Sequence, residues 1–299
     1  MDLKSLLLVA ASLVALPASA ALNIFACEPE WGALAKELAG PKSTIYVATT
    51  ALQDPHRIDA RPSLIARARS ADLVVCTGAE LEIGWMPLVQ SQSGNAKIHR
   101  GAPGYFEAAG HVTLMEPPRR VDRSQGDVHA AGNPHVHLDP ANIADIADAL
   151  AARMAQLDPP EAAQYRERGK AFIARWQEAA TRWQKQAAPL KGMPVVVYHR
   201  DLSYLLRWLG LQEVGSLEPK PGLPPSATHL SGLLESLKAK PAKAVLRAAY
   251  NDPRAAQWLS ERAGIPVVVL PYTVGGTEKA TDLFTLYDVT LSSLLRVAQ

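Results

Sequence analysis

Histidines in three separate segments are the residues of this chain best suited to binding a metal ion. Residues 133–140 read Asn-Pro-His-Val-His-Leu-Asp-Pro, so His135 and His137 lie two residues apart on a stretch stiffened by prolines. His56 ends the sequence Asp-Pro-His, and His199 directly follows the apolar run 194–198. Imidazole nitrogen is a ligand that zinc prefers. If the three segments meet, they predict a zinc site.

Short apolar runs alternate with helical spacing on both sides of these histidines. In the first half we expect strands over 22–27, 43–47 and 71–76, with helices over 30–38 and 62–69. In the second half we expect strands over 195–198, 212–216, 244–247 and 266–270, with helices over 202–209, 226–240, 253–263 and 282–297. This order predicts an α/β fold with two parallel sheets. Ligands bind beyond the carboxyl ends of such strands, where His56 and His199 lie.

The middle of the chain reads as two consecutive helices. Asp139 and Pro140 are a good start for a helix that runs to about residue 157, and two prolines follow it. Residues 161–188 form a longer helical pattern, roughly 42 Å long at the usual helical rise. We therefore expect an N-terminal α/β domain over 21–158, a linking helix over 159–190 and a C-terminal α/β domain over 191–299, with the metal site in the cleft between domains. We also expect a helix to begin at Glu80 and loops to fill most of 91–133.

The first twenty residues resemble a secretory signal. Lys4 precedes an apolar run over 5–16, and Pro-Ala-Ser-Ala ends the segment with small residues at the cleavage position. We expect cleavage after Ala20 and export to the periplasm. No later apolar run reaches the length of about 20 residues needed to span a membrane.

Net charge and cysteine content exclude some functions. A formal net charge of +2 gives no reason to expect nucleic acid or anionic lipid as a partner. The two cysteines, Cys27 and Cys76, each end an apolar run. In an oxidising compartment they could pair, or each could be a small buried hydrophobe. We favour the unpaired state, because neighbouring strands strain a disulfide.

The chain resembles the metal-specific cluster of periplasmic solute-binding proteins, which deliver zinc or manganese to ABC importers. The resemblance is carried by Asp-Pro-His at 54–56, Pro-Ser-Leu at 62–64, the segment 133–140, the long helix and His199. In that family, the residue ending the first strand of the second domain is histidine in zinc proteins and glutamate in manganese proteins. The resemblance implies that His56, His135 and His199 bind Zn(II) and that the partner is a membrane permease.

The chain departs from the family pattern near the second ligand. His137 stands where the family has tryptophan. Because alternate residues of extended chain point to opposite sides, we expect His135 rather than His137 to be the ligand, with His137 as a possible additional one. The family's histidine-rich loop is reduced to 126–132. We expect its His129 to be exposed to solvent, with a metal contact as the alternative.

The fourth ligand remains open. Val274 occupies the position of an aspartate that often completes the site in the family. Water, Glu278, Asp282 or a carboxylate near Glu80 could take its place.

The expected function is capture of Zn(II) by an exported monomer and its delivery to an ABC-type importer. Nitrogen ligands favour zinc over manganese, whereas copper would also bind tightly, so manganese- and copper-binding homologues are alternatives. A zinc-dependent hydrolase is a further alternative, because residues 135–139 match most of a His-x-His-x-Asp-His motif. Pro140 occupies its last position and cannot bind a metal. An adhesin with the same fold is the third possibility.

Overall fold

The computed structural model describes residues 21–118 and 126–298. The expected signal segment and its cleavage after Ala20 lie outside the described residues. Within the described ranges, no helix is long and apolar enough to cross a membrane.

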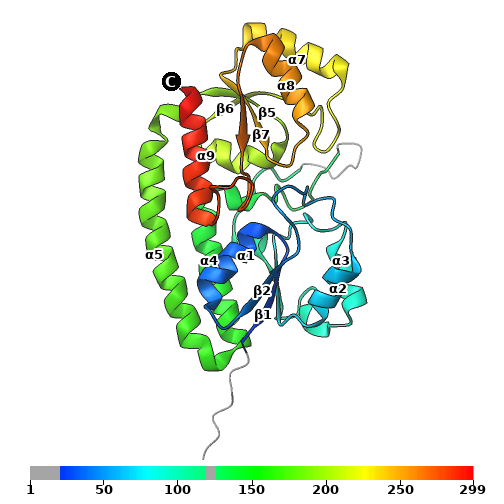
Figure 1. Cartoon of the computed structure of the whole chain (residues 1–299), viewed down its shortest axis with the longest axis vertical. Helices are drawn as coiled ribbons and strands as arrows, with labels where there is room; N and C mark the ends of the chain where they lie inside the picture. The colour runs from blue at the N-terminus through cyan, green and yellow to red at the C-terminus, as the bar shows by residue number, and fades with distance from the viewer. Residues whose placement is uncertain (1–20, 119–125, 299) are drawn as a thin grey trace, which may run out of the picture.

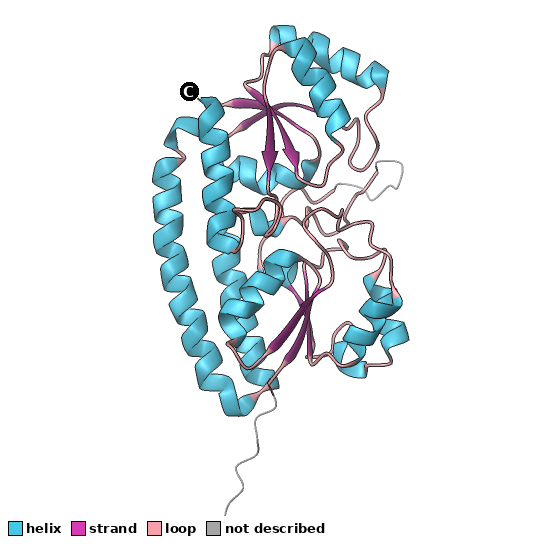
Figure 2. Cartoon of the chain, in the orientation of Figure 1, coloured by secondary structure: helices cyan, strands magenta, loops and turns pink. Residues whose placement is uncertain are grey.

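The strands form two separate four-stranded parallel sheets (Figure 2). The first sheet has the order β2-β1-β3-β4 and contains β1 (Asn23–Ala26), β2 (Thr44–Val47), β3 (Leu73–Cys76) and β4 (Tyr105–Glu107). The second has the order β6-β5-β7-β8 and contains β5 (Pro194–Val197), β6 (Gln212–Ser216), β7 (Ala244–Ala248) and β8 (Val267–Leu270). The predicted α/β class with two parallel sheets is confirmed. The two sheets have the same strand order: in each, the first strand of its half, β1 or β5, lies between the second and the third.

Shorter helices connect the strands of each sheet. The first half contains α1 (Pro29–Ala39), α2 (Pro62–Arg69) and α3 (Met86–Ser93). The second half contains α6 (Ser203–Leu209), α7 (Ala227–Ala239) and α8 (Pro253–Ala263). Proline at the first turn and side-chain caps set several of these starts; Ser226, for example, caps α7 by accepting a hydrogen bond from the His229 backbone.

Three long helices pack together along one side of the molecule, with α5 in contact with the other two (Figure 1): α4 (Pro140–Leu157), α5 (Ala162–Gln186) and α9 (Leu283–Ala298). Helix α5 runs along one side of the molecule and packs against α1, α4 and α9. Its buried face includes Trp176, whose indole N–H donates to the Pro140 carbonyl at 2.8 Å. The expected long helix is confirmed. The domain boundaries at 158 and 190 remain predictions.

Two features of the first half differ from expectation. No helix begins at Glu80: Ala79 and Glu80 have left-handed backbone, with φ of 48° and 68°, so the chain turns there and α3 begins at Met86. Left-handed backbone at two consecutive residues is incompatible with a right-handed helix. The segment expected to be loop contains β4, a strand of only 3 residues. Its pairing with β3, rather than its own composition, defines it as a strand.

The expectation of unpaired cysteines was wrong. Cys27 and Cys76 form a disulfide, with Cα atoms 4.8 Å apart. The register places Ala26 opposite Val75, so the two cysteines follow as direct neighbours. That Cα separation lies within the range that disulfides occupy.

Candidate metal centre

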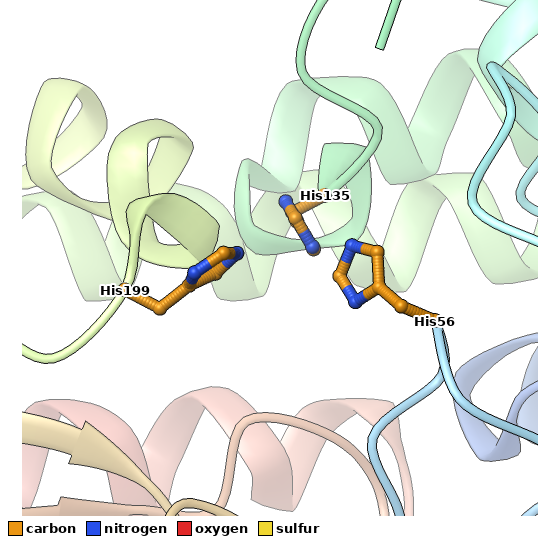
Figure 3. A group of neighbouring side chains, drawn as sticks. All are labelled: His56, His135 and His199. Atoms are coloured by element: carbon orange, nitrogen blue, oxygen red, sulfur yellow. The ribbon is translucent and has the colours of Figure 1, made fainter. Parts of the chain in front are cut away.

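The three predicted histidines come from segments that the fold brings to one point between the sheets. His56 lies in the loop after β2, His199 directly follows β5, and His135 precedes the short turn that leads into α4. The carboxyl ends of both sheets therefore border the same region, as expected for parallel sheets. Figure 3 shows the three rings turned toward one another. One ligand atom from each histidine lies within 4.8 Å of the others.

Each of these imidazoles is held by a hydrogen bond at Nδ1. The partners are Asp54 for His56 at 2.8 Å, Asn133 for His135 at 2.8 Å and Glu218 for His199 at 2.6 Å. The three partner atoms are side-chain oxygens that accept, so in the neutral ring Nδ1 carries the hydrogen and Nε2 the lone pair. The fold thus selects the tautomer in which Nε2 can bind a metal.

The Nε2 atoms of two of these histidines lack a competing partner in the described part of the chain. Those of His56 and His135 are buried and have no hydrogen-bond partner among the described residues. The ring centroids of the three histidines lie 5.4 to 5.9 Å apart. Buried polar atoms normally have a partner, so unpaired nitrogens that converge point to a ligand.

Hydrogen bonds of Asn133 connect the first half of the chain with the second. Asn133, which orients His135, also donates from its side-chain amide to the Arg200 carbonyl at 2.9 Å, next to His199. The Tyr204 hydroxyl donates to the Asn133 carbonyl at 2.8 Å. The positions of His135 and His199 are therefore linked through backbone and side chain.

The surroundings shift the pKa values of His135 and His199 in opposite directions. Burial, followed by the neighbouring imidazoles, holds the pKa of His135 well below its ordinary value. Burial alone would lower the pKa of His199, but the hydrogen bond with Glu218 and the charge of Asp201 outweigh it and raise that pKa to about 8. His135 is therefore neutral at pH 7, while His199 in the metal-free protein carries a proton that a metal must displace.

His129 does not lie exposed in solvent, contrary to expectation. It is half-buried, and its ring centroid lies 5.3 Å from that of His56 and 6.4 Å from that of His135. Its Nε2 is buried without a hydrogen-bond partner among the described residues. The 126–132 loop is held against the second half because the Asp127 N–H donates to the Pro221 carbonyl at 2.9 Å. That long-range contact, which local polarity cannot reveal, places the imidazole at the site.

The other additional candidates lie elsewhere. His137 is buried and lies outside the converging group: its Nε2 is 3.1 Å from the Tyr272 carbonyl, and its Nδ1, which has no hydrogen-bond partner among the described residues, is 3.3 Å from a Glu30 oxygen. Glu278 is exposed and does not belong to the converging group. Asp282 accepts from the Thr285 backbone at 2.7 Å, which fixes the start of α9. Glu80 accepts from the Ala130 backbone at 2.9 Å and so supports the 126–132 loop.

Two cavities border the histidines. One, of about 660 Å³, is lined by residues that include His56, His199 and Tyr250. The other, of about 600 Å³, is lined by residues that include His129, His135 and His199. An ion can therefore reach the site from solvent.

The sequence matches the family described as zinc-uptake complex component A, periplasmic (ZnuA), over residues 24–297. The chain belongs to the ZnuA family. Proteins of this family are metal-binding solute-binding components of ABC transporters and not enzymes, so the hydrolase alternative is set aside.

Individual relatives of the ZnuA family carry two different metals in their names. The high-affinity zinc uptake system protein ZnuA of Bacillus subtilis is 23% identical over 251 residues, covering 83% of this chain and 77% of that protein. The manganese ABC transporter substrate-binding lipoprotein scaA of Streptococcus gordonii is 22% identical over 287 residues, covering 94% of this chain and 89% of that protein. A crystal structure of ZnuA shares the fold with a TM-score of 0.73 and 21% identity, over 93% of this chain and 97% of that one.

Proposed function

We propose that this protein captures Zn(II) with His56, His135 and His199 and delivers it to the membrane permease of an ABC importer. The observation that carries the proposal is the convergence of three imidazoles whose Nδ1 atoms are already bound by oxygen acceptors. This arrangement aims the three Nε2 atoms at one point before any ion arrives, and at pH 7 the His199 ring must give up a proton on binding. Preorganised ligands reduce the cost of binding.

The ligand set favours zinc over manganese. Three neutral nitrogens suit an ion of intermediate softness, whereas manganese is better served by carboxylate, carbonyl and water oxygens. A glutamate in place of His199 would shift the site toward manganese. Copper binds imidazole tightly as well, and its preference for tetragonal geometry separates it from zinc at a site built from three converging rings.

His129 is an auxiliary imidazole of the proposed site. It lines the cavity of about 600 Å³ together with His135 and His199 and lies next to His56, so an ion that enters through this cavity can contact it. Its pKa is lowered by burial and by His56 to about 4, which leaves the ring neutral and able to bind at pH 7. His137 has no such role, because its nitrogens face Tyr272 and Glu30.

The cellular setting follows from the same function. Export with cleavage after Ala20 would place the protein in the periplasm, where an importer's solute-binding component works. We expect it to act as a monomer that docks on its permease.

Competition between the metal-free protein and a chromogenic zinc chelator tests the proposal. The unaltered protein should take up one zinc ion, and His56→Ala, His135→Ala and His199→Ala should each weaken binding at least about 100-fold, since each removes a direct ligand. His229→Ala is the matched control: His229 lines the same cavity but its Nε2 is bonded to the Ser216 carbonyl at 2.9 Å. Unchanged zinc affinity in His199→Ala would contradict the proposal.

A further inference from the structure

Asp201 is a buried carboxylate that the three-histidine site leaves unexplained. It lies two residues after His199, in the short turn Arg200–Leu202 that leads into α6, and is only 1% exposed. One carboxylate oxygen, Oδ2, accepts a hydrogen bond from the Tyr250 hydroxyl at 2.8 Å. The other, Oδ1, is buried and has no hydrogen-bond partner among the described residues. An unpaired buried carboxylate oxygen is costly and calls for a reason.

The surroundings of Asp201 belong to the metal centre. Tyr250, whose hydroxyl holds Oδ2, lines the cavity of about 660 Å³ together with His56 and His199. The Tyr250 ring lies 5.2 Å from that of Tyr272, whose ring lies 6.1 Å from that of His135. Asp201 is therefore held by a residue that borders the histidines.

The other carboxylates at the centre are already engaged. One oxygen of Asp54 accepts from His56 and one oxygen of Glu218 accepts from His199, so each carboxylate already orients an imidazole. Three neutral imidazoles leave the double charge of a bound ion without a directly bound anion. A buried carboxylate is stabilised when a cation compensates its charge.

We propose that Asp201 Oδ1 binds the captured ion as its fourth protein ligand, completing a site of three nitrogens and one oxygen. This inference rests on the proposed function. The proposal requires the Asp201 side chain to turn toward the ion, because its oxygen does not belong to the group of ligand atoms that lie within 4.8 Å of one another. The hydrogen bond from Tyr250 holds Oδ2 and directs Oδ1 during that movement.

His129 is the competing candidate for the fourth position. Its ring lines an open cavity and is carried by a loop, which suits a residue met on entry. Asp201 lines neither cavity and is held by Tyr250, which suits a residue at the floor of the site. Asp201 also supplies the negative charge that a fourth imidazole lacks.

The test compares Asp201→Asn with His129→Gln in zinc competition and in the visible spectrum of the cobalt-loaded protein. Asp201→Asn should weaken zinc binding about 10- to 100-fold and change the intensity of the cobalt d–d bands, because a direct oxygen ligand is lost. His129→Gln should lower zinc affinity by less than Asp201→Asn and keep the cobalt spectrum of the four-coordinate site, whereas His229→Ala, whose Nε2 is bonded to the Ser216 carbonyl at 2.9 Å, should leave both unchanged.

Different failures lead to different conclusions. If the unaltered protein binds zinc and Asp201→Asn matches it in affinity and spectrum, or if His129→Gln causes the loss instead, Asp201 is not the fourth ligand. If the unaltered protein binds no zinc, the proposed function itself fails. Tyr250→Phe provides a second variant should Asp201→Asn not fold. Loss of the Tyr250 hydroxyl, which holds Asp201, should also weaken zinc binding, by a smaller factor. Unchanged zinc affinity in Tyr250→Phe would overturn the inference.

Discussion

Hydrogen bonds at Nδ1 decide what the three central histidines can do. Asp54, Asn133 and Glu218 each accept from one ring and leave Nε2 as the free nitrogen. The same residue type at position 137 is held instead at Nε2, by the Tyr272 carbonyl, and its Nδ1 faces Glu30 rather than the centre. The chemistry of each histidine therefore depends on its partners more than on its presence in a motif.

Zinc affinity should depend on pH through His199. Because its pKa is raised to about 8 in the metal-free protein, zinc must displace one proton below that pH. Affinity should fall about tenfold for each unit of pH below about 8 and stay level above it. The raised pKa also stabilises the metal-free fold at low pH, and this contribution is lost as pH rises through about 8.

Zinc competition from about pH 6 to 9, with calorimetry in buffers of different ionisation enthalpy, measures both affinity and proton release. A flat affinity between about pH 6.5 and 8, or no proton released at pH 7, would contradict the assignment of the proton to His199.

His137→Ala should separate folding from metal binding. The side chain is 1% exposed and connects Glu30 of the first half with the Tyr272 carbonyl of the second. Its loss leaves a cavity and unpaired polar groups, so we expect destabilisation of about 2 to 4 kcal/mol. Zinc affinity should change much less than in His135→Ala. Urea unfolding and zinc competition on both variants provide the comparison; equal losses of affinity would make His137 a ligand.

Positions beside a proline or at a strand end, together with the family resemblance, predicted that His56, His135 and His199 meet, and their ligand atoms do converge. His135 rather than His137 lies in this group, although residues 136–138 form a 3-10 turn and not the extended chain on which that choice was based. Glu218, Asp201 and Tyr250 carry no local signal of a metal site. Their roles arise from contacts between segments far apart in the chain, which a single sequence does not encode in its spacing.

At the scale of elements, the 126–132 loop and the turn at 218–222 form one connection across the two halves. The Asp127 carboxylate packs against Gly222, and the Glu218 oxygen that holds His199 also accepts from the Gly222 N–H at 2.8 Å. Arg57, next to His56, donates to the Gly222 carbonyl at 3.0 Å. A change at Gly222 should therefore disturb the entrance to the site and the orientation of His199 together.

Gly222→Ala should speed zinc release. Gly222 has φ of +75°, and an added Cβ would overlap the Asp127 carboxylate, so the 126–132 loop must move away. We expect release to quicken about tenfold or more if loop contact controls it, measured by stopped-flow transfer of zinc to a chelator. Gly94→Ala is the matched control, because its φ of +66° carries similar backbone strain with nothing within 4 Å of the added Cβ. Equal rates in the two variants would exclude a role for the loop contact.

Helices and strands were predictable where the apolar periodicity agrees with the positions of prolines and glycines. Helices α2 and α8 and strand β6 lie where proline, glycine and apolar spacing placed them. The turn at Ala79 and Glu80 was missed because two non-glycine residues adopt left-handed backbone there. Strand β4 was missed because 3 residues show no periodicity, and pairing with β3 defines it.

At the scale of the molecule, α5 and α9 limit how the two halves can move. Helix α5 packs against α1 of the first half and against α9, which also contacts β8 of the second. A large hinge closure would break this buried packing. We therefore expect capture and release to proceed through small tilts and ordering of loops, as in modest population shifts between similar states.

Small-angle scattering and hydrogen exchange should show this mode of binding. The radius of gyration should be the same with and without zinc within error, whereas backbone amides at 52–58, 126–132 and 218–222 should gain protection. Amides within α5 should change little and serve as the internal control. A clear contraction on zinc binding would show that the helices do act as a hinge.

The most direct test of the central claim is X-ray absorption at the zinc edge of the stoichiometric complex, with His199→Ala measured beside it. The account predicts three imidazole nitrogens at about 2.0 to 2.1 Å in a four-coordinate shell, with one imidazole fewer in the variant. A shell without imidazole, or one unchanged by loss of His199, would contradict it.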